Sequence, residues 1–438
     1  MEAKNCGREA AHLRLERSDD LAQRVSYGYA CALLVVLALF LPYGGYERMM
    51  EGKYHCYLAL TLGYLAALCA VVPVRRPRLT AMQACAVAYL AWAALSAACS
   101  PYGAAALLGG TRRDGLLTLA LYVATFLTLS RYLRPDTRLL ALTALSVTLC
   151  DALTLAQIAG FDPLRLYPEG LGYWDGDLAY AGFYAGTAGN IDFTAFLLAL
   201  ALCVLAAAIV RLKMWALAPT VALTLWTLAR LGVATAWVGV ACAAVWGLAL
   251  LCPKRRGLML AVSAGICVLG VVFVACYTGG NQTLREASLL LHGEARSDFG
   301  SARWGVWLNC LVLARERPLL GGGPGTLWLR NLPPFLWTVE GETVESTVTA
   351  AHNEYLHTLV ELGAPALAAY LALLIAAIVR CYRRAADTRW AVCGVGLVCY
   401  AAMACFSIAT CITAPYVWLL LSLCVGAEND WQSLTKAP

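Results

Sequence analysis

Apolar stretches long enough to cross a membrane alternate with short polar segments along most of the chain. A helix needs roughly 20 consecutive apolar residues to cross the hydrocarbon core of a bilayer. The pattern predicts about 12 transmembrane helices, near 27–43, 54–74, 79–99, 115–133, 138–160, 191–210, 212–229, 232–252, 257–278, 356–379, 390–411 and 413–427. We therefore expect an all-α integral membrane protein with one large loop, residues 279–351, between the ninth and tenth spans.

Composition supports this interpretation. Of the 438 residues, 61% are hydrophobic and only 14% are charged, and the mean hydropathy is +0.67. A soluble globular protein of this size is less apolar and carries more charge. Nearly all of the 19 cysteines lie inside the predicted spans, and none forms a CxxC pair, so we interpret them as small packing residues.

The distribution of Lys and Arg predicts the orientation of the chain. Cytoplasmic loops carry the excess of basic residues in multi-spanning proteins. With the N-terminus inside, the short inner turns hold fifteen Lys and Arg, whereas the short outer loops hold six, which are Arg48, Lys53, Arg112, Arg113, Arg165 and Arg230. Both termini are therefore predicted to be cytoplasmic, and the net charge of +6 is a topology signal that does not indicate nucleic-acid binding.

These expectations divide the chain into five parts. They are a cytoplasmic N-terminal segment (1–26), a bundle of about nine spans (27–278), the large outer loop (279–351), about three further spans (352–427) and a cytoplasmic tail (428–438). A loop as long as 279–351 with helical patterning of its own is usually functional. Its glycine-rich stretch "PLLGGGPGTL" lacks the GxxxxGK[ST] spacing of a phosphate loop, although its backbone amides could contribute to an anion site.

Six arginines on the predicted outer side run against the positive-inside trend: Arg112, Arg113, Arg230, Arg303, Arg315 and Arg317. Several planar guanidinium groups converging on one pocket would suit a diphosphate. The alternative is that each arginine reaches to the membrane interface or pairs with a local acid. For Arg230 we favour a function, because it lies between two spans with almost no loop around it.

Two of the five histidines flank the start of the tenth predicted span. His352 and His357 are five residues apart, which on a helix leaves them about 140° apart, so they could not share a metal ion. No HExxH motif or cysteine cluster adds to them, and we predict no metal site. A neutral imidazole at His352 could act as a general base; alternatively, His352 caps the span and His357 packs at the interface.

Glu361 follows nine residues after His352. On a continuous helix it would lie about 14 Å deeper, inside the bilayer. An intramembrane carboxylate is a functional candidate by default. The alternative is a protonated or paired structural acid.

Together these residues resemble those of bacterial O-antigen ligases and related surface-polysaccharide polymerases. That family has a His-(Asn/Ser)-x-x-Leu-x-x-x-x-Glu-x-Gly signature where its large outer loop re-enters the membrane. The chain matches it at His352, Asn353, Leu356, Glu361 and Gly363.

Three further motifs resemble the family, in the expected order. The family's Arg-x-x-x-Trp helix followed by Pro-x-x-Gly-x-Gly is matched here by Arg303, Trp307, Pro318, Gly321 and Gly323. The motif "RRDG" from Arg112 resembles Arg-x-(Asp/Glu)-Gly, and "GNID" resembles Gly-Asn-x-Asn with Asn190 retained and Asp192 replacing the second Asn. Where the family often has Ser-Arg-Gly, only Arg230 is retained.

The resemblance implies a type-C glycosyltransferase-like fold in the bacterial cytoplasmic (inner) membrane, with the active site on the extracytoplasmic side. It implies transfer of a glycan from undecaprenyl diphosphate to a hydroxyl of a glycolipid, glycan or wall polymer, without a cofactor. The implied roles are His352 and Glu361 in catalysis, and Arg230, Arg303, Arg112 and Arg113 in diphosphate binding. Asn353, Trp307, Asn190 and Asp192 would support the site.

A transporter or exporter of a polysaccharide precursor or small solute is the alternative. Such a protein is expected to have charges near the middle of several spans and repeated halves. The singled-out charges instead cluster on one side, at span ends and in loops, and no internal repeat is visible. We therefore favour the enzyme.

Overall fold

The computed structural model describes residues 2–72, 79–174, 182–339 and 342–425, and helices make up most of them. Seven helices are long and apolar enough to cross a membrane, by length and composition: Gly45–Val71, Ala81–Ala98, Thr137–Ile158, Ile191–Leu212, Ala234–Leu251, Pro253–Ala275 and Ala364–Arg383. Four shorter apolar helices are Leu116–Tyr132, Trp215–Leu231, Thr388–Met403 and Ala414–Leu423. The chain is a multi-pass helical membrane protein.

The helices of the described chain, in order, are α1 (Glu2–Ala32), α2 (Met49–Val71), α3 (Ala81–Ala98), α4 (Ala104–Leu108), α5 (Leu116–Tyr132), α6 (Thr137–Ile158), α7 (Ile191–Leu212), α8 (Ala218–Leu231), α9 (Ala234–Leu251), α10 (Arg256–Ala275), α11 (Gln282–Leu291), α12 (Arg303–Glu316), α13 (Glu354–Leu362), α14 (Ala364–Arg383), α15 (Thr388–Met403) and α16 (Ala414–Leu423). Two strands, β1 (Phe335–Val339) and β2 (Glu342–Ser346), form an antiparallel pair.

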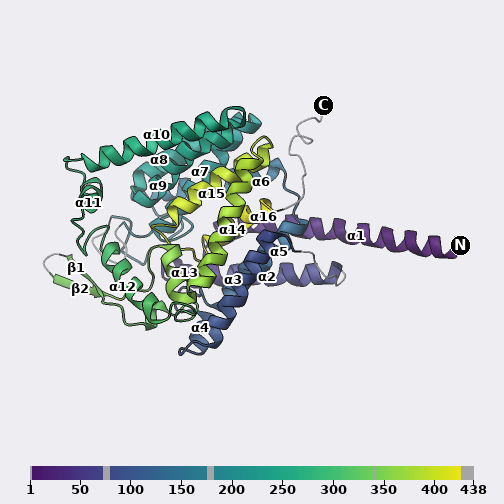
Figure 1. The fold of residues 1–438 in the computed structure, drawn as a ribbon, viewed down its shortest axis with the longest axis horizontal. Helices are drawn as coiled ribbons and strands as arrows, with labels where there is room; N and C mark the ends of the chain where they lie inside the picture. Colours follow the sequence, from purple (N-terminus) through teal and green to yellow (C-terminus); the bar gives the residue numbers. More distant parts are fainter. Residues whose placement is uncertain (1, 73–78, 175–181, 340–341, 426–438) are drawn as a thin grey trace.

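Helix α15 lies at the centre of the bundle and packs against α9 and α7, while α14 packs against α3 and α16 against α5 (Figure 1). Nearly every residue of α15 is buried, from Thr388 to Met403. By contrast, α10 lies at the edge against α9, and only Ser263 on it is buried. An apolar helix exposed nearly all round is suited to contact lipid.

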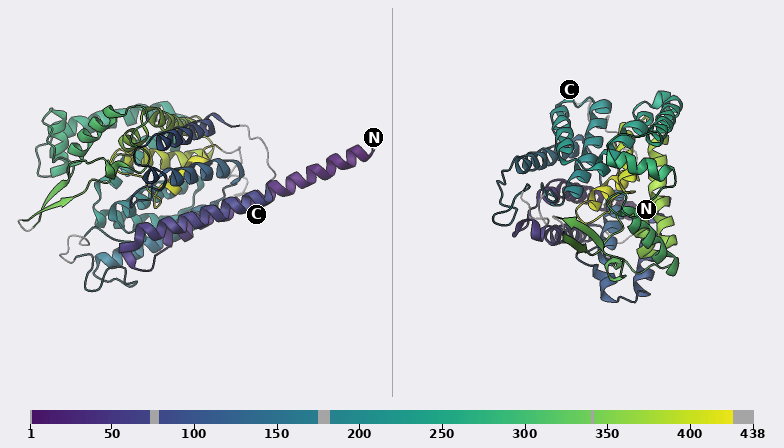
Figure 2. Two further views of the ribbon diagram at one scale, coloured as in Figure 1. Left: turned by 90° about the horizontal axis from the view of Figure 1, so that it is seen from below. Right: turned by 90° about the vertical axis from the view of Figure 1, so that its left-hand side faces the viewer.

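The elements of the large outer loop gather at one end of the bundle (Figures 1 and 2). Helices α11 and α12 and the β1–β2 hairpin lie there, opposite the end from which α1 projects. The expectation of an all-α chain was therefore wrong in one detail, because residues 335–346 include this hairpin. The first predicted span, 27–43, is the end of a much longer helix that starts at Glu2 and continues through a π-helical turn, Leu33–Leu37.

Lys53 does not lie in an outer loop, as the charge count assumed. It lies in α2 and is only 1% exposed. Its ammonium group donates hydrogen bonds to the carbonyls of Leu37, at 2.6 Å, and Ala38, at 3.0 Å. These carbonyls lie at the end of the first helix, where intrahelical donors run out, so Lys53 caps that helix from its neighbour.

The tenth predicted span, 356–379, is broken into two helices at Gly363. This residue has φ 85° and ψ 173°, and it separates α13 from α14. A Cβ at this position would lie 2.0 Å from the carbonyl oxygen of Leu319. The membrane-spanning helix therefore begins only at Ala364, and α13 lies outside it.

We predict that Gly363→Ala destabilises the protein, because the backbone conformation is essentially restricted to glycine and the outer loop leaves no room for a Cβ. The expected loss is about 1–3 kcal/mol, measured as a lower midpoint of thermal unfolding in detergent. Gly265→Ala is the matched control, since nothing lies within 4 Å of its added Cβ in α10. Equal midpoints for the two variants would contradict the assignment of Gly363.

Candidate active site

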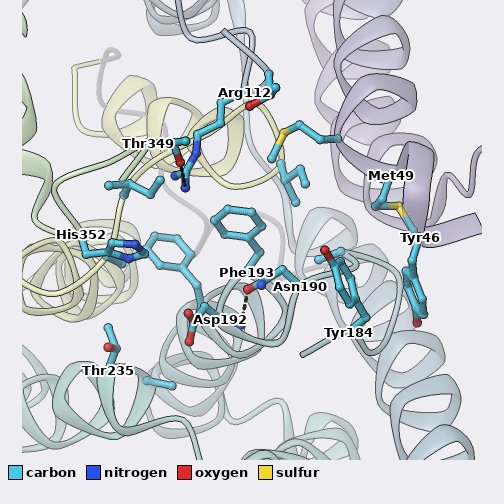
Figure 3. Close-up of a pocket in the computed structure, with 18 of the residues that line it drawn as sticks. Tyr46, Met49, Arg112, Tyr184, Asn190, Asp192, Phe193, Thr235, Thr349 and His352 are labelled. Atoms are coloured by element: carbon cyan, nitrogen blue, oxygen red, sulfur yellow. Dashed lines mark hydrogen bonds between the residues drawn. The ribbon is translucent and has the colours of Figure 1, made fainter. Parts of the chain in front are cut away.

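A cavity of about 330 Å³ lies at the end of the bundle that carries the outer loop. Its walls come from the start of α2, the loop before α5, the first turns of α7 and α9, the loop before α13 and the loop between α15 and α16. Figure 3 shows His352 and Arg112 on one side of it and Asp192, Asn190 and Tyr184 across from them. Segments far apart in the sequence thus meet at one cavity.

His352 lines this cavity and precedes α13, with a positive φ of 48°. Two neighbours fix the backbone on either side of it. The indole Nε1 of Trp307 donates to the carbonyl of Ala351 at 3.0 Å, and Asn353 caps α13 by accepting from the amide of Leu356 at 3.0 Å. Because His352 is not helical, the helical depth that we calculated between it and Glu361 does not apply.

Arg112 lines the same cavity, whereas Arg113 does not. The Nη2 group of Arg112 donates to Oγ1 of Thr349 at 3.0 Å. In the described part of the chain, its Nη1 group is buried and has no hydrogen-bond partner. A guanidinium nitrogen left unpaired in a polar cavity is costly unless a ligand binds it, and this points to an anionic ligand.

The first turn of α7 contributes Asn190 and Asp192 to the opposite wall. Asn190 caps the helix, because its Oδ1 accepts from the backbone amide of Asp192 at 2.8 Å. The carboxylate of Asp192 remains directed into the cavity (Figure 3). The retained Asn therefore has a structural role at the helix start, and the Asp supplies an acceptor for polar ligand groups.

The other two predicted arginines, Arg303 and Arg230, lie in different places. Arg303 is the first residue of α12, and its charge acts on both Asp192 and His352. Arg230 is exposed at the C-terminal end of α8 and does not line the cavity. Of the four arginines with an implied role in diphosphate binding, Arg112 is the one that the structure brings into the cavity wall beside His352.

The surroundings of His352 keep its imidazole neutral. Burial lowers the pKa of His352 to about 3, and the positive charges of Arg112 and Arg303 contribute to the shift. A histidine whose pKa lies well below its ordinary value is a neutral imidazole at neutral pH, with one ring nitrogen protonated and the other free. Its free nitrogen can therefore accept a proton, although weakly while the arginine charges remain unneutralised.

Glu361 does not line the cavity with His352, so the structure does not support the catalytic role predicted for it. Its carboxylate accepts hydrogen bonds from two amides of the glycine-rich stretch, Gly325 at 2.7 Å and Leu327 at 3.1 Å. Those amides do form an anion site, as the sequence suggested, but the anion is a side chain of the same protein. Glu361 holds the outer loop against α13.

His357, which we had taken for an interfacial packing residue, is instead the centre of a buried charged cluster. Its Nε2 lies 3.5 Å from Oε2 of Glu361 and 3.9 Å from Oδ2 of Asp114. The sequence contained one signal for this, because His357 and Glu361 are separated by four residues and so share a helix face. Asp114 comes from a distant loop and could not be paired with them from the sequence alone.

The cavity combines a cation, a neutral imidazole and a carboxylate, which suits a polar anionic substrate with hydroxyl groups. Among the residues that the structure describes, no group of three or more His, Cys, Asp or Glu side chains is arranged to hold a metal ion. The fold and the cavity together define a multi-pass membrane protein with a polar site between its outer loop and its helical bundle.

Sequence comparison shows which family part of the chain is similar to. A family model described as O-Antigen ligase matches residues 219–371, which run from α8 into α14 and include Arg230, Arg303, His352 and Glu361. The match confirms the resemblance to the O-antigen ligase family over these residues, and that family implies a glycosyltransferase-like enzyme of polysaccharide biosynthesis with a lipid-linked glycan as its substrate. A search of curated proteins found no match to the chain.

We predict that His352 is neutral throughout the range from pH 5 to pH 8, because its pKa lies near 3. The measurement is NMR of the protein labelled with ¹⁵N-histidine, with the His352 signal assigned by His352→Gln. Arg112→Met removes a nearby positive charge and should raise the pKa of His352. Arg113→Met is the control and should leave the signal unchanged; an imidazolium signal at pH 7 would refute the prediction.

Proposed function

We propose that the chain is a glycosyltransferase that moves a glycan from undecaprenyl diphosphate to a hydroxyl acceptor on the outer face of the cytoplasmic membrane. One observation carries the proposal: Arg112, whose Nη1 group has no hydrogen-bond partner among the described residues, and the neutral imidazole of His352 line the same cavity. The family match supplies the class of reaction. Glu361, proposed from the sequence as catalytic, is assigned here to positioning the outer loop.

The diphosphate of the donor would bind between Arg112 and Arg303. The free Nη1 of Arg112 would donate to a phosphate oxygen, in the geometry that makes arginine a common phosphate ligand. Positive charge aimed at the leaving group stabilises the charge that develops on it in the transition state. Arg303 would supply longer-range attraction from the start of α12.

In the transfer step, the acceptor oxygen forms a new bond to the anomeric carbon of the glycan. The bond from that carbon to the diphosphate oxygen breaks, and its electron pair stays on the undecaprenyl diphosphate. His352 accepts the proton of the acceptor hydroxyl through its free ring nitrogen. Asp192, on the opposite wall, would accept hydrogen bonds from hydroxyl groups of the sugar.

Donor binding would also make His352 a stronger base. Burial is the largest cause of its low pKa, and the positive charges of Arg112 and Arg303 lower that pKa further. An anionic diphosphate bound near these arginines would offset their part of the shift. The pKa of His352 would then rise toward the neutral range, where general bases are most effective. Proton abstraction would thus be coupled to the presence of the leaving group.

We predict that His352→Gln lowers glycan transfer by about 100-fold or more, the usual contribution of a general base, without lowering the amount of protein in the membrane. The measurement is restoration of surface glycan in a deletion strain, with the lengths of lipid-linked and surface glycans analysed. His292→Gln is the control, because His292 is exposed beyond α11 and outside the cavity. Wild-type transfer by His352→Gln would contradict the proposed base.

We further predict that Arg112→Met weakens binding of undecaprenyl diphosphate by at least tenfold, about 1.4 kcal/mol. Arg303→Met should weaken it less, because its side chain does not line the cavity wall. Binding is measured on the purified protein in nanodiscs, with Arg113→Met and Arg230→Met as matched controls that should bind like the wild type. Equal affinity of all four variants for undecaprenyl diphosphate would show that the diphosphate does not bind in this cavity.

A further inference from the structure

The buried cluster behind the cavity joins three separate segments through charged side chains. His357 and Glu361 come from α13, and Asp114 comes from the loop before α5. The side chains of these residues are 10%, 7% and 17% exposed, respectively. Glu361 also reaches the glycine-rich stretch through the amides of Gly325 and Leu327.

The backbones of the three segments are closely packed around the cluster. A Cβ on Gly325 would lie 2.6 Å from Cα of Gly109 and 2.9 Å from Oδ1 of Asp114. The amides of Gly322 and Gly323 donate to the carbonyls of Val360 and Glu361 at 3.0 and 2.8 Å. The loop before α5, the glycine-rich stretch and α13 are therefore in direct contact where the charges meet.

The same segments carry the two cavity groups of the proposed mechanism. Arg112 precedes Asp114 by two residues, and its side chain faces the cavity while that of Asp114 faces His357. His352 precedes His357 by five residues, and the amide of His357 donates to the carbonyl of Asn353 at 2.8 Å. Any displacement of Asp114 relative to His357 would therefore change the position of Arg112 relative to His352.

A second, smaller cavity of about 40 Å³ adjoins His357. A polar cavity of this size can hold a few water molecules. Within the described residues, Nδ1 of His357 and the hydroxyl oxygen of Tyr122 are buried without hydrogen-bond partners, and both residues line this cavity. An imidazolium would need an acceptor at Nδ1, and a water in this cavity could provide it.

We propose that His357 is a positioning residue that, as an imidazolium, holds Asp114 and Glu361 together and so sets Arg112 against His352 across the diphosphate site. A positive ring between two carboxylates offsets their mutual repulsion, which a neutral ring could not do. Loss of this charge would loosen the loop that carries Arg112. The consequence for diphosphate binding rests on the proposed function, whereas the charge of His357 does not.

Burial by itself lowers the pKa of His357, but the carboxylates of Glu361 and Asp114 outweigh it and raise this pKa to about 9. A group whose pKa is raised in the folded protein contributes its stabilising charge below that pKa and loses it as the pH rises through it. The other titratable or charged groups that face the cluster are Glu354, His352 and Arg112, together with the phenols of Tyr89, Tyr122, Tyr370 and Tyr400.

The first test needs no substrate. In ¹⁵N-histidine NMR of the full-length protein in nanodiscs, His357 should be an imidazolium at pH 7.5 and lose its proton with a midpoint near pH 9. The His352 signal should shift with the same midpoint, because Asp114 and His357 connect the two groups. Glu361→Gln removes one carboxylate and should move both midpoints toward neutral by at least one unit.

The second test measures binding of undecaprenyl diphosphate as a function of pH. Wild-type affinity should fall at least tenfold across the His357 midpoint, and in Glu361→Gln the fall should begin at lower pH. His357→Gln should bind weakly at every pH without this fall, while the control His292→Gln should behave like the wild type. If the cluster served only as packing, His357→Gln would change the affinity relative to the wild type by the same factor at all pH values.

Two results would overturn the proposal: a neutral His357 at pH 7.5, or a His352 signal that does not respond to the titration of His357. Failure of the wild type to bind undecaprenyl diphosphate at any pH would instead refute the proposed function. In that case the NMR measurement still decides whether His357 links the two loops. Glu361→Gln keeps the shape of the side chain, so the pH shift can be measured even if His357→Gln folds poorly.

Discussion

The arrangement of the segments around the candidate site depends on the contacts of the Glu361 carboxylate. This carboxylate is almost fully buried, accepts two backbone hydrogen bonds from the glycine-rich stretch and lies beside His357. A buried carboxylate is tolerated only when hydrogen bonds and opposite charge replace its hydration. Meeting that requirement brings three segments, from three distant parts of the sequence, to one place.

The candidate active site is a consequence of that convergence. Arg112 and His352 belong to segments held by the cluster, while Asp192 belongs to the rigid first turn of α7. One wall of the cavity is therefore set by helices of the bundle and the other by the loops that precede α5 and α13. Catalytic groups need to be held in a fixed geometry by their surroundings, and the buried cluster provides that support from behind the cavity.

Most of the fold could be predicted from the sequence, because crossing a bilayer imposes a simple length and polarity requirement on each helix. Each predicted span overlaps a helix, except that the tenth overlaps two, α13 and α14, and the boundaries of α3, α5 and α6 fall within two residues of the predicted ones. The hairpin at Phe335–Ser346 was missed, since the predictions there rested on the length and polarity of the loop. The break at Gly363 was missed because the apolar pattern continues through it, although the glycine itself was recognised as part of a motif.

The site was predictable only where a motif stayed local. His352 and Asn353 could be singled out because their neighbours in sequence are also their neighbours in space, and the family resemblance supported them. The roles predicted for Glu361 and Arg230 stay predictions. The contacts of His357 and Glu361 could not be predicted, because their partners include groups from other segments. The sequence determined the spans and the residue types available at the outer face through hydrophobicity and local motifs. Tertiary structure alone decided that Arg112 rather than Arg113 faces His352, and that His357 joins Asp114 to Glu361, because long-range packing sets which side chains meet.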